Sequence, residues 1–577
     1  MRSNQIQIAQ KELREARKAS RKLYWFVGIL SFFANMLMLT GPLYMLQLYD
    51  RVLSSRSEAT LIALSVLVVF LYGIMGILDY TRGRIMARVA ARFQSGLDLR
   101  VFDAMIRRSS VGASKSAQTG LSDLESIQRL ISSPVMASAF DLPWTPFFLV
   151  GIALFHPWLG ILALAGGALL IIASLLNQAF SKRPSAEANQ AAQRGALMSD
   201  QMRNESEMIE SMGMRDSAFG RWQTVRNESL QKTMTTGDVT GSFTSMIKSL
   251  RLLLQSAMLG LGAYLVLQNE LTPGAMIAGS ILLGRALAPI ELAINQWGLV
   301  QRAQLGWANL VELLSEVSPV GEKTQLPPPK ARLGIRNLTV VPPGGKTASL
   351  KNLSFDVDPG QAIGIIGPSG AGKSTLARAL TGMWRPAGGS IRLDGAALDQ
   401  YTDAVLGEHI GYLPQRVQLF DGTITENIAR LDLQPDAERV VKAAQRAAAH
   451  EMILQLPDGY DTRIVASNSR LSGGQMQRIG LARALYSNPV ILILDEPNSN
   501  LDNVGSMALN QAIRQFKADD RAVLIMAHRP AAIQECDILL VLESGMRAAF
   551  GSKEDVLKET VQNHATLQKN TLMGGVT

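Results

Sequence analysis

One long uncharged run decides what kind of protein this chain can be. No charged residue occurs between Leu23 and Tyr49. A membrane-spanning α-helix needs about 20 predominantly apolar residues, so this run can cross a bilayer. The other apolar runs lie at 60–78, 136–155, 159–176, 252–267 and 275–296. The sequence therefore predicts six spans, of which the sixth is the weakest.

The links between these spans differ in length and charge. The segments 79–134 and 181–251 are long and basic, whereas 49–59, 156–158 and 268–274 are short and carry few positive charges. Since positively charged links stay on the cytoplasmic side, we expect the N-terminus and both long segments in the cytoplasm. The long segments also have helical periodicity, so the membrane helices are predicted to extend as rods into the cytosol.

Composition agrees with this placement. The net charge of +9 could suit a nucleic-acid binder, but basic cytosolic links account for it, and we expect no nucleic-acid partner. The polar, basic residues 1–22 precede a run too long for the h-region of a cleavable signal peptide, so we expect a retained cytosolic lead-in helix there. The single cysteine, Cys536, excludes an internal disulfide framework and a Cys-based zinc cluster, and is expected to be a buried structural thiol.

Three charged residues fall inside the predicted spans: Asp141, Arg285 and Glu291. A charge at mid-membrane costs about 2.5 to 3.5 kcal/mol on insertion scales, so such groups usually face protein or a water-filled path. For Asp141 an equal alternative is a position near the interface. Arg285 and Glu291 are six residues apart, so they do not share one face of a regular helix, although Pro289 loosens that geometry.

The second half has the pattern of an α/β domain. After the proline-rich segment QLPPPKARLG, short apolar runs alternate with glycine turns and helices. We expect a lead-in helix at 1–22, a transmembrane domain with cytosolic helix extensions at 23–315 and a linker at 316–334. A nucleotide-binding domain at 335–555 and a C-terminal tail at 556–577 complete the predicted organisation.

A phosphate-binding loop (P-loop) pattern, GPSGAGKST, follows the apolar run AIGIIG. A strand that feeds this loop is the context in which the motif binds phosphate. Lys373 is expected to reach the β and γ oxygens, and the Ser374 hydroxyl to bind Mg²⁺. The predicted phosphate contacts are Gly367, Pro368, Ser369, Gly370, Ala371, Gly372, Lys373, Ser374 and Thr375.

Two further apolar runs end in polar residues. VILILDEP ends in Asp495, placed to hold Mg²⁺ through water, and Glu496, placed to accept a proton from the attacking water. AVLIMAH delivers His528 to the end of another predicted strand, where it could contact the γ-phosphate or the leaving group. A structural histidine is the common alternative.

A second anion site is predicted at RLSGGQMQRIGLARAL. Ser472, Gly473 and Gly474 stand at the start of a predicted helix, where free N–H groups and the helix dipole favour an anion.

In chain order, the P-loop, Gln415 in GYLPQ, LSGGQ, Asp495 with Glu496, Asp502 in NSNLD, and His528 resemble the full motif set of an ATP-binding cassette (ABC) domain. In that family the LSGGQ signature of one domain caps the ATP held by the P-loop of another, which implies a homodimeric half-transporter. The resemblance also implies ATP and Mg²⁺ as cofactors. It places Gln415, Glu496 and His528 in catalysis and Ser374, Gln415 and Asp495 around the metal. The nucleotide contacts that it adds are Ser472, Gly473, Gly474, Gln475 and Asp502.

The membrane half is similar to a narrower group. LTGPLYMLQLYDRVLSSRSEATL and DLPWTPFFLVGIALFHPWLG resemble the permease/ATPase of bacterial type I secretion systems, specifically the PrtD-like protease-exporter branch. This implies export of an unfolded polypeptide with a C-terminal signal across the bacterial inner membrane. The implied partners are a periplasmic membrane-fusion (adaptor) protein and a TolC-like outer-membrane channel. A half-transporter for lipid or small amphiphiles shares the same catalytic motifs and stays an alternative.

Two departures from related patterns stand out. Residues 335–353 contain no aromatic residue to stack on adenine, and 465–470 lack the glycine and glutamate often found before the signature. No N-terminal peptidase domain is expected either, so we do not expect leader-peptide cleavage. A soluble cassette ATPase acting on nucleic acid or ribosomes is disfavoured by the six spans.

Overall fold

The computed structural model describes residues 2–112, 114–319, 323, 326–465, 471–499, 501, 503–528 and 530–558. It divides into two compact units, a helical one up to residue 319 and an α/β one that follows, with 110–112 grouped with the second. Six helical segments of the helical unit are long and apolar enough to cross a membrane. The prediction of six spans is therefore confirmed for the part of the chain described.

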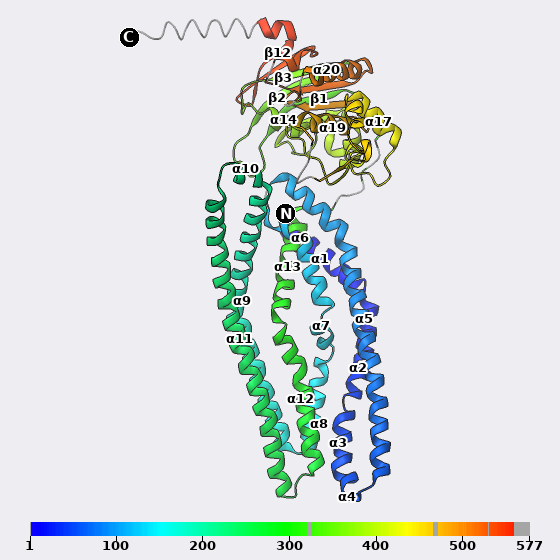
Figure 1. The fold of residues 1–577 in the computed structure, drawn as a ribbon, viewed down its shortest axis with the longest axis vertical. Helices are drawn as coiled ribbons and strands as arrows, with labels where there is room; N and C mark the ends of the chain where they lie inside the picture. Colours follow the sequence, from blue (N-terminus) through cyan, green and yellow to red (C-terminus); the bar gives the residue numbers. More distant parts are fainter. Residues whose placement is uncertain are drawn as a thin grey trace, which may run out of the picture. The chain divides into compact units, whose positions relative to one another are not determined.

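The helical unit contains long continuous rods. α5, α9 and α11 have 54, 48 and 53 residues, which is about 70 to 80 Å at 1.5 Å per residue and more than twice the hydrocarbon thickness. α9 and α11 lie side by side (Figure 1). The predicted extension of the spans as rods is confirmed. The helices are α1 Arg2–Lys18, α2 Arg21–Leu37, α3 Thr40–Gln47, the π-helix η1 Leu48–Val52, α4 Leu53–Ser55, α5 Glu58–Val111, α6 Lys115–Ile131, α7 Pro134–Ala139, the 3₁₀-helix η2 Leu142–Trp144, α8 Thr145–Phe155, α9 Pro157–Asn204, α10 Ser206–Ser211, α11 Arg215–Leu267, α12 Pro273–Asn295 and α13 Trp297–Glu316.

The lead-in helix α1 packs against the end of the same unit. Leu13 is fully buried, and α1 contacts α13. Glu12 accepts a hydrogen bond from Arg100 of α5 at 3.0 Å, and Arg100 also donates to the backbone oxygen of Val317 at 2.6 Å. These contacts fasten α1 to α5 and α13.

Two spans are interrupted, which the apolar runs alone did not indicate. The first breaks between α2 and α3, at Met38 and Leu39, and then ends in the π-helix η1. There Asp50 accepts hydrogen bonds from the N–H of Gly274 at 2.9 Å and the hydroxyl of Thr272 at 2.7 Å. Because these groups start α12, Asp50 joins the first span to the sixth. The third span breaks between α7 and η2, at Asp141.

The structure pairs two of the three charged residues of the spans, Asp141 and Glu291, with protein groups. Asp141 is 7% exposed and pairs with Arg82 at 2.7 Å, while Asn35 donates to it at 2.7 Å. Of the two alternatives for Asp141, burial against protein is therefore the one observed. Arg82, which lies in the basic segment 79–134, is itself only 8% exposed. Glu291 pairs with Arg251 of α11 at 2.8 Å rather than with Arg285.

The second unit contains a six-stranded sheet in the order β12-β11-β3-β10-β9-β6, parallel except for the edge strand β12, and a four-stranded antiparallel sheet in the order β2-β1-β4-β5. β1 begins two residues inside the predicted linker. The strands are β1 Leu333–Val340, β2 Leu350–Val357, β3 Ala362–Ile366, β4 Gly388–Leu393, β5 Ala396–Ala397, β6 Ile410–Leu413, β7 Gly422–Thr423, β8 Arg463–Ile464, β9 Ile491–Asp495, β10 Ala522–Met526, β11 Ile538–Glu543 and β12 Met546–Ser552. The helices are α14 Lys373–Leu380, η3 Leu398–Gln400, α15 Asp403–His409, α16 Ile424–Ile428, α17 Ala437–Arg446, α18 His450–Leu454, η4 Gly459–Asp461, α19 Gly473–Leu485, α20 Asn503–Ala518 and η6 Pro530–Ile533.

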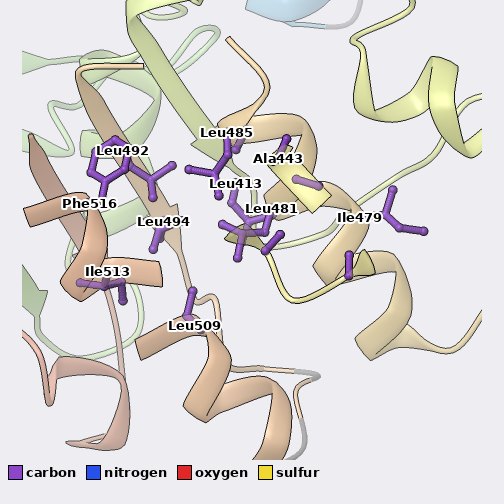
Figure 2. Packing of buried hydrophobic residues seen from close by; sticks show 14 of the residues in the cluster. Leu413, Ala443, Ile479, Leu481, Leu485, Leu492, Leu494, Leu509, Ile513 and Phe516 are labelled. Carbon is purple, nitrogen blue, oxygen red and sulfur yellow. The ribbon is translucent and has the colours of Figure 1, made fainter. Parts of the chain in front are cut away.

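Buried side chains cover both faces of the parallel sheet. Along β9, Leu492 and Leu494 belong to one core cluster and Ile491 and Ile493 to the other, as the alternation of a strand requires. Figure 2 shows the first cluster, where leucines of β6 and β9 pack against α17, α19 and α20. Cys536 is buried in this cluster, and burial raises the pKa of its thiol to about 12, in agreement with a structural role. Layers on both faces leave the carboxyl edge of the sheet as the place for polar groups.

Candidate functional site

Four neighbouring strands deliver the predicted site residues to one edge of the sheet. β3 runs into the P-loop, β9 ends at Asp495, β10 precedes His528 and β6 precedes Gln415. Because these strands are parallel and adjacent in the order β3-β10-β9-β6, their carboxyl ends meet. The fold therefore brings together residues that are more than 150 positions apart in the sequence.

The P-loop requires glycine at two tight points. A Cβ on Gly367 would lie 2.2 Å from the backbone oxygen of Leu542, and one on Gly372 would lie 2.9 Å from that of Ser349. Gly372 also has a φ of 102° at the start of α14. Between them Pro368, Ser369 and Gly370 are exposed, so the loop presents its backbone to solvent at the start of a helix.

Lys373 is held beneath this loop. Its ammonium donates to the backbone oxygens of Gly367 at 2.8 Å and Pro368 at 2.9 Å, and lies 3.4 Å from Nδ1 of His528. Burial lowers the pKa of Lys373, while the charges of Glu496 and Asp495 act in the opposite direction. The geometry keeps the charge at the loop, where a phosphate group would meet it.

Asp495 combines burial with an unused oxygen. It is 3% exposed, and burial raises its pKa, against a hydrogen bond from Ser374 that acts to lower it. Among the described residues its buried Oδ1 has no hydrogen-bond partner. A carboxylate oxygen of this kind beside a hydroxyl is the ligand type that Mg²⁺ prefers, so the residues present fit the predicted metal.

Glu496 lies between Gln415 and His528. One carboxylate oxygen accepts from the Gln415 amide at 3.0 Å, and the other lies 3.0 Å from Nε2 of His528. Glu496 has a φ of 50°, which is unusual for a residue with a side chain, and its N–H donates to the backbone oxygen of Met526 at 2.9 Å. The turn after β9 thus directs this carboxylate back over the sheet edge, within reach of a water molecule that it could deprotonate.

The signature residues form a complete helix cap. The Ser472 hydroxyl accepts from the N–H of Gln475 at 3.2 Å, and the N–H of Ser472 donates to Oε1 of Gln475 at 2.8 Å. This reciprocal capping box starts α19. Ser472 and Gly473 are exposed, so this helix start is open to a second molecule.

Two predictions lie outside the described residues. Asp502 is one, and most of the 465–470 segment before the signature is the other. A residue that the sequence analysis missed is Gln477, a buried side chain of α19 that donates to the backbone oxygens of Glu496, at 3.5 Å, and Pro497. The sequence feature that could have indicated it is a second glutamine two residues after the last residue of LSGGQ.

Comparisons with known proteins agree with this geometry. The family model for ABC transporters matches residues 350–499, and the model for the ABC transporter transmembrane region matches 24–287. The type I secretion system ATP-binding protein PrsD of Rhizobium meliloti (strain 1021) is 39% identical over 558 residues, 96% of each chain. The chain belongs to this type I secretion branch of the ABC transporters.

Other members of the group are more distant. The cyclolysin secretion/processing ATP-binding protein CyaB of Bordetella pertussis is 28% identical, over 93% of this chain and 76% of CyaB. The leukotoxin translocation ATP-binding protein LktB of Mannheimia haemolytica is 27% identical, over 94% and 77%. The structure of a bacterial Atm1-family ABC exporter with ATP bound shares the fold, with a TM-score of 0.81 and 23% identity over 94% of this chain and 96% of the other.

This type I secretion ABC transporter therefore binds ATP and couples its hydrolysis to transport. It is a multi-pass membrane protein with a cytoplasmic ATPase domain.

Proposed function

We propose that this ABC transporter moves an unfolded polypeptide with a C-terminal signal from the cytoplasm across the bacterial inner membrane. The observation that carries the proposal is the likeness to PrsD, which extends over 96% of both chains and so includes the spans as well as the ATPase domain. We further propose a periplasmic adaptor protein and a TolC-like outer-membrane channel as partners, with the spans embedded in the lipid bilayer.

The working unit in this proposal is a homodimer. The chain carries one P-loop and one signature, and the exposed, capped start of α19 supports an approach by a second copy. In a C₂ dimer Ser472, Gly473, Gly474 and Gln475 of one chain would meet the nucleotide on the other chain's P-loop, and Asp502 would join that interface. Two composite sites would result.

Within each site we assign roles from the contacts. Gly367 to Thr375 would hold the phosphates by backbone N–H groups, with Lys373 at the β and γ oxygens. Ser374, Gln415 and Asp495 would hold Mg²⁺, which when bound neutralises charge on the phosphates.

Glu496 would accept the proton of the attacking water. Gln415 and His528 would orient its two carboxylate oxygens, in keeping with their 3.0 Å contacts. Since Nδ1 of His528 also lies 3.4 Å from Lys373, the ring would be within reach of the γ-phosphate that Lys373 is proposed to hold.

The cargo class is tested by ATPase activity of the detergent-purified protein. The effector is a C-terminal fragment of the nearest encoded repeat-rich secreted protein, and the control is the same fragment without its terminal signal. A change in rate with the intact fragment alone supports polypeptide export. Indifference to both fragments, together with stimulation by lipid, would favour the lipid half-transporter instead.

A further inference from the structure

Gln477 links the signature helix to the catalytic base of the same chain. We propose that Gln477 is a positioning residue that sets Glu496 according to whether the start of α19 has docked on the partner's nucleotide. The proposal rests on the homodimer proposed above. In this proposal, the position of Glu496 in each chain depends on whether nucleotide is bound to the P-loop of the other chain.

The bonds of Gln477 are specific and buried. The side chain is 2% exposed, and its amide donates to the backbone oxygens of Glu496 and Pro497. Leu413 and Leu481 border the same small space. A buried amide among apolar side chains is costly without partners, so these two carbonyl oxygens hold Gln477 and are held by it.

The backbone of Glu496 is thereby held on two sides. Its N–H donates to Met526 of β10 at 2.9 Å, and its carbonyl oxygen accepts from Gln477 of α19. A φ of 50° persists only where the surroundings enforce it. A shift of α19 would therefore move the Glu496 carboxylate, and a displacement of about 1 Å can cost about 10²-fold in rate.

α19 is anchored at its other end, so it can act as one rigid element. Arg483 donates to the backbone oxygens of Gln418 and Asn427, each at 2.9 Å, and Arg430 donates to the backbone oxygens of Arg483 at 3.0 Å and Ala484 at 3.1 Å. Gln418 lies three residues after Gln415, so the far end of α19 is tied to the segment that holds the other side of Glu496.

We call the hydrogen bonds from Gln477 to the backbone oxygens of Glu496 and Pro497 the tether. The signature residues and the tether are close together on α19. Gln477 lies five residues after the Ser472 cap, about 7.5 Å along the axis. The positive end of the helix dipole attracts a phosphate group on a partner chain. Docking of the helix start on that phosphate would shift α19. The hydrogen bonds from Gln477 would then shift the backbone of Glu496 and bring its carboxylate to the position in which it accepts the proton of water.

The first test replaces Gln477 with leucine, which keeps the length and removes the amide. We expect kcat for ATP to fall about tenfold or more in the purified dimer, while KM and the Kd for a fluorescent ATP analogue change less than twofold. The matched control is Gln511→Leu on an exposed position of α20, which should leave both unchanged. An unchanged kcat in Gln477→Leu would overturn the proposal.

The second test uses mixed dimers purified through two different tags, without cargo. In one, a Gln477→Leu chain is paired with a Glu496→Gln chain, so the single remaining base sits on the chain without the tether. In the other, both substitutions lie on one chain and the partner is wild type, so the remaining base keeps its tether.

We expect the first dimer to be at least tenfold slower than the second. Since both contain the same two substitutions, general loss of folding would slow them equally, and equal rates overturn the proposal. If the wild-type chain itself runs as a monomer, the proposed dimer fails and this coupling fails with it. Because the readout is ATP hydrolysis without cargo, an error in the proposed cargo class leaves the comparison intact.

Discussion

Both units of this transporter bury charged side chains, but the two units differ in whether those charges have partners within the protein. In the helical unit Arg82 and Asp141 pair across 2.7 Å, with Asn35 as a further donor to Asp141 and Asp79 as a second partner of Arg82 at 3.1 Å. In the nucleotide-binding unit Asp495 keeps a buried oxygen without a partner among the described residues, and the Lys373 ammonium donates to two backbone oxygens and lies beside His528 rather than beside a carboxylate.

Whether a buried charge has a partner distinguishes groups that hold the fold together from groups that are placed to bind a ligand. A buried carboxylate whose charge is paired joins elements, here α2, α5 and the break in the third span. A buried carboxylate that is incomplete is destabilising until something binds it, which is the usual property of an active site. Substitutions in the two places should therefore have opposite consequences.

The largest effect is expected for Glu496→Gln. The amide keeps the shape but cannot accept a proton, so we expect ATP hydrolysis to fall by about 10² to 10⁴-fold. ATP binding should persist and trap a closed dimer, visible as a stable shift in cross-linking or size. Normal turnover by this variant would refute the role of Glu496 as base.

A smaller effect, on stability alone, is expected when the buried pair is broken. Asp141→Leu removes the buried carboxylate 2.7 Å from Arg82 and leaves it, among the described carboxylates, only the partly exposed Asp79 at 3.1 Å, so the variant should cost at most about 3 to 5 kcal/mol. The double variant with Arg82→Met should recover much of this loss, because neither buried charge then remains and Asp79 is partly exposed to solvent. Thermal unfolding in detergent measures both.

The exposed pair of Arg183 and Glu187 in α9 is the matched control for this pair. Glu187→Ala should cost less than about 1 kcal/mol. If Asp141→Leu proves no more harmful than Glu187→Ala, the comparison between the two units fails.

The smallest effect is a gain in stability from Asp495→Asn. Burial raises the pKa of Asp495, so the folded chain binds this proton more tightly than the unfolded chain does. The ionised form therefore lowers stability at neutral pH and not below about pH 4, where the carboxyl is protonated in both states.

We accordingly expect the nucleotide-free Asp495→Asn variant to unfold at a higher temperature than wild type at pH 7. The gain should shrink as the pH falls, and Mg²⁺-dependent ATP hydrolysis should be lost. Differential scanning fluorimetry with the exposed Asp458→Asn variant as control measures the shift. A lower unfolding temperature at pH 7 would contradict the assignment of an unsatisfied carboxylate.

Much of this molecule could be predicted from the sequence because the signals are local. Apolar runs of about 20 residues predict spans wherever they occur, since the bilayer demands them. The P-loop pattern after AIGIIG predicts a strand, a glycine turn and a helix for the same kind of reason. Glu496 and His528 could be named because each follows a buried strand.

Contacts between distant residues could not be predicted in this way. Nothing local links Arg82 to Asp141, or Asp50 to the start of α12, and the breaks in the first and third spans lie within uninterrupted or nearly uninterrupted apolar sequence. Gln477 was missed because its proposed role depends on which backbone oxygens its side chain contacts, and these lie on another segment of the chain.

The sequence by itself determined the six spans, their extension as long helical rods and the motifs of the nucleotide-binding domain, because each depends on residues near one another in the chain. Only the tertiary structure decided which buried charges are paired and which are left for a ligand. The strand order brings Gln415, Glu496 and His528 to one edge, and helix packing buries Arg82 against Asp141. Whether a buried polar group has a partner depends on what the fold places beside it.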